Sequence, residues 1–466
     1  MSLLKNFSFV FGAQTAVLII SVVRALILPK FLSMDGFGYW EIYWFYITWC
    51  GLFCLGYNDG IYLEYGECDY NQLPIKLIRS STRLFICMLT IFTFIAVSAI
   101  FLFTSNGDLQ FALFFSALDI IVLGLTGLFI YIFQITNQFK KYSFYSIIDK
   151  VLVLVVIILL LIANEQNYKY IIVTDFLSKV LVLICMIYKG RELIIGETED
   201  FKKSAHFMRN MMSIGMKLLV ANLMSMLLVG AGKFIVQIYG NIKDFAIYSF
   251  GMSITGLVLT SVTAFSLVLY PAVKRIRVEE YSALFNKIND FTRLFGLSSI
   301  LLYFPVYCLV EIIYPQYASV LIYLNILFAL IFLQCKISIL DNTFYKALRE
   351  EQNMLIANLT CVGLFFILAL AIFTCYNEIW VIALCTFIAM FYRSYRSEVY
   401  LNHKIDLSFN KQNWTEILMI GLFLLSTTVF SFTIAFVTIF TAYTIWFISR
   451  YYHHKNLLME FLKNRH

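Results

Sequence analysis

Apolar segments about as long as a membrane is thick recur along the whole sequence, and short polar connections separate them. An α-helix needs about 20 apolar residues to cross the hydrocarbon core of a bilayer, and about fourteen segments approach that length. They lie at roughly residues 7–29, 39–57, 84–104, 110–135, 144–163, 168–188, 210–238, 245–273, 291–314, 318–340, 354–376, 379–400, 415–430 and 433–450. The pattern predicts an all-α, polytopic membrane protein.

The two ends of this pattern need separate interpretation. Residues 414–451 form one apolar stretch, which is too long for one crossing and long enough for two short ones. The first segment is longer than the apolar region of a cleaved signal peptide, which spans roughly 7–15 residues. We therefore expect a retained first helix, and one or two helices at the C-terminal end.

Composition and charge agree with a membrane protein. Hydrophobic residues make up 61% of the chain and charged residues 14%, against about 25% charged in soluble domains. The net charge is +7, and the basic residues gather in alternate connections, whereas Lys30, Lys169 and Lys243 lie on the opposite side. Cytoplasmic loops collect Lys and Arg, so both termini are expected in the cytoplasm. The expected cytoplasmic set includes Lys76, Arg79, Arg83, Lys140, Lys141, Lys189, Arg191, Lys202, Lys203, Arg209, Lys274, Arg275, Arg277, Lys346, Arg349, Arg393, Arg396 and Lys404.

A polar connection at about residues 189–209 divides the expected helices into two halves, and we interpret it as a solvated linker. We expect an N-terminal lobe (1–190, six helices), a C-terminal lobe (210–400, six helices), an extra helix pair (412–452) and a cytoplasmic tail (453–466). A weak internal repeat supports two lobes. The segment from Asp35 to Trp40 after the first helix resembles that from Lys243 to Tyr248 after the seventh.

Arg24 and Lys233 each lie near the outer end of an expected span, one in each lobe. A charge at the centre of a membrane helix costs about 2.5–3.5 kcal/mol on insertion scales, so such residues usually face water or a partner. Either side chain could extend its charge to the membrane interface. Their matched depth in the repeat favours the other interpretation, in which both cations face a central cavity and bind substrate.

The middle of the sixth span carries Asp175 and, four residues later, Lys179. This spacing places both on one helix face and suits an ion pair. The pair either is structural and offsets the cost of burying its own charges, or lines the cavity and exchanges partners with substrate or a proton. Asp119, in the fourth span, has no basic residue at helical spacing, so it is either an ion-coupling group or a structural carboxyl. Lys179 is thus the third candidate substrate-binding cation, and Asp119 and Asp175 are the candidates for ion coupling.

Lys217 and Lys336 lie nearer the inner ends of their spans, and we expect both to extend to the interface. Together with Arg24, Lys179 and Lys233, they make five candidate cations against the two candidate acids Asp119 and Asp175. A cavity with this surplus suits an anion such as a lipid pyrophosphate headgroup, because Arg forks onto phosphate and Lys acts as a point charge.

The sequence contains no Walker A loop, H-E-x-x-H, G-x-S-x-G or C-x-x-C motif. We therefore expect no enzyme activity, cofactor, metal or nucleic-acid partner, and we interpret the ten cysteines as packing residues. Glu67-Cys68-Asp69 looks like the acidic motif of membrane glycosyltransferases that use lipid-linked donors. Those enzymes need the motif outside, whereas the charge pattern places it inside, so we interpret it as a solvated loop.

Four short motifs occur along the chain in a fixed order. They are Arg24–Trp40 (RALILPKFLSMDGFGYW), Ile238–Phe250, Tyr270–Arg275 and Ile313–Tyr317. The ordered set resembles bacterial polysaccharide exporters, the Wzx-type O-antigen flippases of the MATE-like (MOP) exporter superfamily. In the first motif, Pro29 is expected to end the first helix, and Ser33 stands where many members carry glycine.

The resemblance implies a two-lobe, twelve-helix core with a central cavity, to which the C-terminal pair is an addition. It implies alternating access without ATP, with proton or ion coupling. The implied substrate is an undecaprenyl-pyrophosphate-linked oligosaccharide, moved from the cytoplasmic to the periplasmic leaflet of the bacterial inner membrane. Membrane lipids and a polysaccharide polymerase machinery are the further implied partners.

Four other functions fit parts of the pattern. A multidrug exporter of the same superfamily would favour an acidic, aromatic cavity, and a lipid II flippase would share the fourteen helices and the cationic cavity. A membrane glycosyltransferase or O-antigen polymerase would need a long outside loop, which the sequence lacks. A membrane scaffold that transports nothing would not require charges in the middle of its helices.

Overall fold

The computed structural model describes residues 3–66, 70–274, 281–373, 376, 378–405 and 413–449, and these residues form helices and connections without a strand. Nine of the described helical segments are long and apolar enough to cross a membrane. The predicted all-α, polytopic fold is confirmed. The Glu67–Asp69 motif, Arg275, Arg277 and the tail 453–466 lie outside the described residues.

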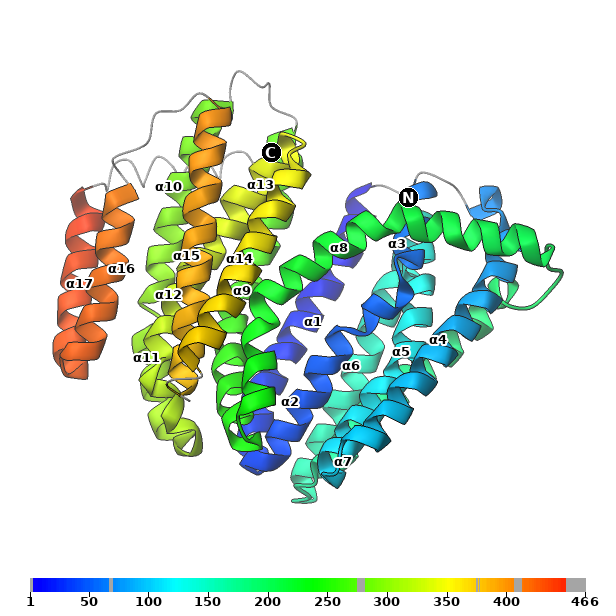
Figure 1. The fold of residues 1–466 in the computed structure, drawn as a ribbon, viewed down its shortest axis with the longest axis horizontal. Helices are drawn as coiled ribbons and strands as arrows, with labels where there is room; N and C mark the ends of the chain where they lie inside the picture. Colours follow the sequence, from blue (N-terminus) through cyan, green and yellow to red (C-terminus); the bar gives the residue numbers. More distant parts are fainter. Residues whose placement is uncertain are drawn as a thin grey trace. The chain divides into compact units, whose positions relative to one another are not determined.

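The chain forms two compact units, Met1–Leu223 and Met224–His466, and their boundary falls within α8. In unit 1, α5 is the central helix and contacts α2, α4, α6 and α7, while α1 packs on α6 (Figure 1). The helices of unit 1 are α1 (Leu3–Phe31), α2 (Met34–Thr48), α3 (Tyr57–Glu64), α4 (Ile75–Phe103), α5 (Gly107–Ile135), α6 (Phe139–Ile162), α7 (Tyr168–Lys189) and the first part of α8 (Phe201–Tyr239), with 3-10 turns η1 (Cys50–Cys54), η2 (Tyr70–Gln72) and η3 (Arg191–Leu193).

Unit 2 is built around α12, whose membrane-spanning window is 83% buried and which contacts α9, α10, α15 and α16. The apolar stretch at the C-terminal end forms two helices, α16 and α17, which lie side by side (Figure 1). The elements of unit 2 are the rest of α8, α9 (Ile242–Lys274), α10 (Tyr281–Ile300), α11 (Tyr303–Ile313), η5 (Pro315–Ile322), α12 (Leu324–Cys335), a π-helical turn η6 (Lys336–Asp341), α13 (Asn342–Ala347), α14 (Glu351–Phe373), α15 (Ile379–Lys404), α16 (Asn413–Val429) and α17 (Phe432–Ser449).

The second expected span, residues 39–57, is not the single helix that we predict. α2 ends at Thr48, a 3-10 turn follows, and the chain resumes as α3. The break lies at Leu55 and Gly56, which have φ angles of 47° and 78°. Only glycine adopts such angles without steric cost. An average over apolar residues cannot detect this change of direction.

The prediction that Pro29 ends the first helix is also wrong. α1 continues past Pro29, and the next amide after the helix, Leu32 N–H, still donates to the Leu28 carbonyl (3.0 Å). Proline lacks its own N–H, so near a helix end it removes a single backbone bond. The chain turns at Ser33 instead, because the Ser33 hydroxyl accepts a hydrogen bond from the Gly36 N–H (3.2 Å) and caps α2.

Glycines bring α3 directly against the first part of α8. A Cβ atom on Gly60 would overlap the carbonyl of Met211, and one on Gly215 would overlap the backbone of Gly56. Gly56 and Gly60 are four residues apart, which is the small-residue spacing that lets membrane helices approach closely. The two helices therefore touch backbone against backbone.

The connection at residues 189–209 is not simply a solvated linker, because α4 holds its first part. Arg79 donates hydrogen bonds to two backbone carbonyls of this segment, and Arg83 donates to two more. Lys76 lies 2.7 Å from the carboxylate of Glu197 and lowers the pKa of that group. The basic residues at the start of α4 thus fix the segment that precedes α8.

Candidate functional site

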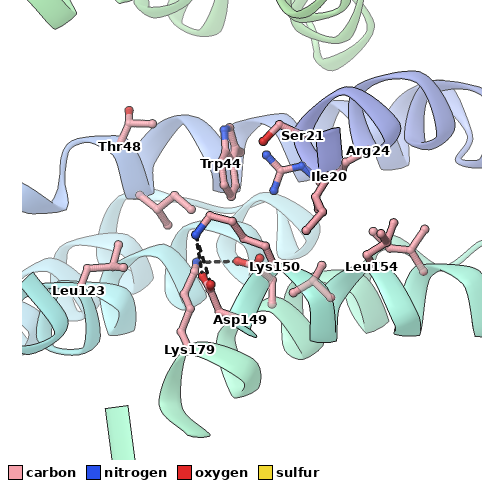
Figure 2. Close-up of a pocket in the computed structure, with 14 residues that line it drawn as sticks. Ile20, Ser21, Arg24, Trp44, Thr48, Leu123, Asp149, Lys150, Leu154 and Lys179 are labelled. Carbon is pink, nitrogen blue, oxygen red and sulfur yellow. Dashed lines mark hydrogen bonds and ion pairs between the residues drawn. The ribbon is translucent and has the colours of Figure 1, made fainter. Parts of the chain in front are cut away.

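A cavity of about 260 Å³ lies within unit 1 and is lined by residues of α1, α2, α5, α6 and α7. Figure 2 shows Arg24 and Trp44 on one side, facing Lys150 and Lys179 on the other. The remaining lining residues are mainly apolar. Two of the three predicted substrate-binding cations, Arg24 and Lys179, therefore share one cavity, and the ion-coupling candidate Asp175 lines it with them.

Lys179 is the centre of a buried cluster, which we call the unit 1 cluster and which consists of Tyr43, Asp119, Asp175 and Lys179. The Lys179 Nζ lies 2.5 Å from Asp175 Oδ2 and 3.1 Å from Asp119 Oδ2, and it donates to the Tyr43 hydroxyl at 3.0 Å. The ion pair that the spacing of Asp175 and Lys179 predicts is confirmed.

Asp119 has no basic residue at helical spacing on its own helix, but α5 and α7 pack together and bring Lys179 to it. Tyr43, which is not among the predicted site residues, bridges the two acids at 2.8 Å from Asp119 Oδ2 and 2.7 Å from Asp175 Oδ2. Its single proton serves one carboxylate at a time. The other Asp119 oxygen accepts no hydrogen bond from any described residue. One ammonium therefore faces two carboxyl groups.

The guanidinium of Arg24 stacks on an indole instead of extending away from the helix bundle. Its carbon lies 3.7 Å from the ring centre of Trp44 and 5.7 Å from that of Trp40. Such a contact contributes about 0.5–2 kcal/mol. Stacking occupies the guanidinium face and leaves the N–H donors at its edge for an anion. The signal for these aromatics was present in the sequence, since Trp40, Tyr43 and Trp44 share one helix face.

Asp149 and Lys150 are not among the predicted site residues, although both fall within the fifth expected span. Lys150 Nζ lies 3.1 Å from Asp149 Oδ2 and also donates to the Ser146 carbonyl. With them, the cavity and the unit 1 cluster hold three cations and three acids: Arg24, Lys150, Lys179, Asp119, Asp149 and Asp175. The lining of the cavity itself has a surplus of one cation, which is smaller than the surplus of three expected from the sequence, and Asp119 beside it cancels that surplus.

The third predicted cation, Lys233, belongs to unit 2 and is not among the residues that line the cavity of unit 1. It lies on α8 with its ammonium 5.9 Å from the ring centre of Phe245 on α9. Lys217, in unit 1, is exposed on the first part of α8, as expected for a side chain that extends to the interface.

The prediction that Lys336 extends to the interface is wrong. Lys336 begins the π-helical turn at the centre of unit 2, and its side chain is only 7% exposed. Its ammonium lies 2.8 Å from Glu398 and 2.6 Å from Glu416. Glu416 also pairs with Arg293 at 2.6 Å. These four residues form the unit 2 network, whose ion pairs offset the cost of burying Lys336.

Arg393, which we expect in a cytoplasmic connection, is fully buried within unit 2. Its Nε donates to Asn358 Oδ1 (2.8 Å) and its Nη2 donates to Asn342 Oδ1 (2.9 Å). Its Nη1 lies 3.6 Å from Asp341 Oδ2. The polar end of α15 therefore packs inside unit 2, whereas the hydropathy pattern predicts that it is exposed to solvent.

The sequence matches the family model described as polysaccharide biosynthesis protein over residues 75–314, which is more than half of the chain. The chain belongs to this family. No curated protein matches the sequence.

Solved structures of membrane transporters share the fold of this polysaccharide biosynthesis family member. The lipid II flippase MurJ in an inward closed conformation is 15% identical, with a TM-score of 0.66 over 97% of this chain and 100% of that one. An inward-facing multidrug resistance MATE transporter of the MOP superfamily is 12% identical, with a TM-score of 0.57 over 84% and 98%. The Vibrio cholerae MATE transporter VcmN is 12% identical, with a TM-score of 0.54 over 86% and 96%. The expected MATE-like fold is therefore confirmed.

Proposed function

We propose that this protein flips a lipid-linked oligosaccharide, such as an O-antigen repeat unit on undecaprenyl pyrophosphate, across the bacterial inner membrane. Transport runs from the cytoplasmic to the periplasmic leaflet by alternating access, and both termini lie in the cytoplasm. The observation that carries the proposal is the cavity of unit 1, where Arg24, Lys150 and Lys179 converge inside an apolar helix bundle. Membership of a polysaccharide biosynthesis family supports this class of cargo.

In this proposal the cations of the cavity bind the charged end of the cargo. Arg24 offers N–H donors from a guanidinium held against Trp44, and Lys179 offers an ammonium that already has two alternative acidic partners. Ligand pockets usually measure about 300–1,000 Å³, so a cavity of about 260 Å³ suits a phosphate headgroup better than a whole oligosaccharide. The sugar chain is then recognised outside this cavity, and Lys233 is our candidate contact in unit 2.

Asp119 and Asp175 are the proposed coupling groups in unit 1. With one ammonium between two carboxyls, arrival of an anion at Lys179 frees a carboxylate to take up a proton or cation. Tyr43 can pass its hydrogen bond from one carboxyl to the other without leaving its place. Membrane lipids and a polysaccharide polymerase machinery are the proposed partners, and the protein is proposed to be a transporter without enzyme activity.

A lipid II flippase is the second candidate function. The likeness to MurJ extends over 97% of this chain, whereas that to the MATE transporter stops at 84%. Replacement of a depleted lipid II flippase distinguishes the two cargoes: rescue of cell growth would favour lipid II, and restored surface polymer without rescue would favour a polysaccharide repeat unit.

Substitution of the cavity cations tests the proposed site. We expect Arg24→Ala to reduce surface polysaccharide at least tenfold at a normal protein level, because the guanidinium is the stacked anion-binding group. Lys233→Ala is expected to reduce it less. Lys217→Ala, an exposed lysine on α8, is the matched control and should retain full polymer. Polymer at the unsubstituted level in Arg24→Ala cells would exclude Arg24 from the site.

A further inference from the structure

Asp341 is the last residue of the π-helical turn η6, and it is fully buried inside unit 2. The turn continues α12, and α9, α10, α13 and α15 also pack against it. Five residues separate Asp341 from Lys336, which is one turn of a π-helix, so the two lie above one another. Turns of this kind occur frequently at functional sites. Neither the family match nor the solved relatives assign a role to this residue.

Both carboxyl oxygens of Asp341 are buried, and neither accepts a hydrogen bond from any described residue. The neighbouring cation, Arg393, stays 3.6 Å away, and its Nη1 likewise has no hydrogen-bond acceptor in the described part of the chain. The other donors of Arg393 go to the neutral amides of Asn342 and Asn358. An ionised buried carboxylate beside a guanidinium normally accepts two short hydrogen bonds from it. The geometry therefore differs from that of a formed ion pair.

Asp341 is the least closely paired acid among the ion pairs that surround it. Among the described residues of unit 2, three buried cations (Arg293, Lys336 and Arg393) contact three buried acids (Asp341, Glu398 and Glu416) and the partly exposed Asp290. The other three acids each have a cation at 2.6–2.8 Å, whereas Asp341 has one only at 3.6 Å. An ionised buried carboxyl whose oxygens accept no hydrogen bond is expensive, and taking up a proton removes its charge. Asp341 is the acid whose surroundings stabilise a charge least.

The chemistry of the site selects a proton over a metal cation. A metal ion on the carboxyl of Asp341 would face the guanidinium of Arg393, and the amide oxygens nearby are already occupied by it. No cluster of three or more His, Cys, Asp or Glu side chains able to hold a metal occurs among the described residues. The titratable and charged groups that surround the pair are Lys336 of the same turn, Tyr345 of α13, Cys361 of α14, Glu398 of α15 and Glu416 of α16.

We infer that Asp341 is a proton-binding site: its carboxyl carries a proton in this conformation, and after releasing that proton to water it closes onto Arg393 as an ion pair. The closure needs a movement of less than one ångström and the release of one amide partner of Arg393. Proton binding itself does not depend on the cargo. Use of this proton as the driving ion rests on the proposed transport function. It would add a coupling site in unit 2 to the acids of the unit 1 cluster.

Infrared difference spectroscopy on the full chain in lipid nanodiscs, perfused with buffers of rising pH, tests this assignment. The unsubstituted protein should show the carbonyl band of a protonated buried carboxyl disappearing as a carboxylate band grows. Asp341→Asn should lack this pair of bands. Asp35→Asn, at an exposed acid, is the matched control and should retain it.

Asp119→Asn separates this inference from the proposed function. Loss of the band in Asp119→Asn alone would overturn the assignment to Asp341 and support coupling in unit 1. An unchanged band in folded Asp341→Asn would also overturn it. Asp341→Glu serves where the asparagine variant does not fold, because it keeps the carboxyl and should move the band to a new frequency. A band that stays at the original frequency in Asp341→Glu would refute the inference.

Discussion

The unit 1 cluster and the unit 2 network are both buried sets of charges inside apolar helices, yet their surroundings differ. The unit 1 cluster borders a cavity of about 260 Å³, which two further cations line. The unit 2 network borders a space of only about 40 Å³. A buried ion pair therefore does not by itself indicate a binding site. The volume beside it separates groups that can change partners from groups that hold helices together.

The energetic consequences follow from the same difference. Glu416 lies at the start of α16 and pairs with Arg293 of α10 and Lys336 of η6, so the network fastens the C-terminal helix pair to the rest of unit 2. In the smaller space of unit 2, removal of one partner leaves a buried charge with little compensation. In unit 1, the cavity of about 260 Å³ leaves room for water beside the cluster, so a lost partner is more easily replaced.

The largest effect is expected from Glu416→Ala. The substitution leaves Arg293 and Lys336 with one acidic partner each, and it should lower the free energy of unfolding by about 3–5 kcal/mol. The measurement is the melting temperature and the yield of detergent-purified protein. Glu165→Ala, at an exposed acid, is the control. Equal melting temperatures for the two variants would contradict the view that the network fastens α16.

Gly60→Ala tests whether unit 1 depends on close helix packing more than on its charges. The added methyl group overlaps the Met211 carbonyl, and the backbone there cannot give way, so we expect a cost of about 3 kcal/mol. Gly363→Ala is the matched control, because a Cβ there meets nothing within 4 Å. Thermal unfolding of both variants decides the point. If Gly60→Ala lowered the free energy of unfolding less than Lys179→Met does, the buried charges would contribute more to the stability of unit 1 than close helix packing.

Lys179→Met should separate stability from activity. Asp119 and Asp175 are left facing each other, but one can take up a proton, so we expect a loss of only about 1–2 kcal/mol. Surface polysaccharide should nevertheless fall at least tenfold, because the variant lacks the ammonium that we propose to bind the anion. Lys179→Arg keeps the charge and should retain part of the polymer. Loss of stability as large as that of Glu416→Ala would mean that the two charge sets have the same role.

The smallest effect is expected at a surface pair that serves as a reference for both buried sets. Hydrogen bonds from Lys404 and Asn353 lower the pKa of Glu350 from 4.5 to about 2. The unfolded chain therefore takes up this proton first, and stability present above pH 4.5 is lost as the pH falls towards 2. For a pair at the protein surface, with Lys404 exposed and Glu350 partly exposed, the amount is about 0–1 kcal/mol. Melting temperatures of Glu350→Gln and the unsubstituted protein should converge over this range, and parallel curves would contradict the prediction.

The fold and part of the site follow from the sequence for identifiable reasons. Apolar length predicts the helices because each one must satisfy its backbone within the membrane. The spacing of Asp175 and Lys179 predicts their ion pair because both residues lie on one helix. Even the division of residues 414–451 into two helices agrees with the length of the stretch.

Contacts between helices are what the sequence could not supply. Asp119 meets Lys179 only because α5 packs on α7, and hydropathy contains no information about that pairing. The same is true of Lys336, for which the rule that lysines extend to the interface fails because Glu398 and Glu416 lie beside it. The π-helical turn is equally invisible, since its residues have an ordinary helical composition.

The crossing of α3 and α8 at Gly56, Gly60 and Gly215 places main chain on main chain, with no side chain between them. A backbone contact of this kind has no side-chain rotamers that could rearrange and no layer of side chains along which the two helices could slide. α3 and the first part of α8 must therefore move together or separate completely. Any motion of α3 relative to α2 is thereby passed on undiminished to the beginning of α8.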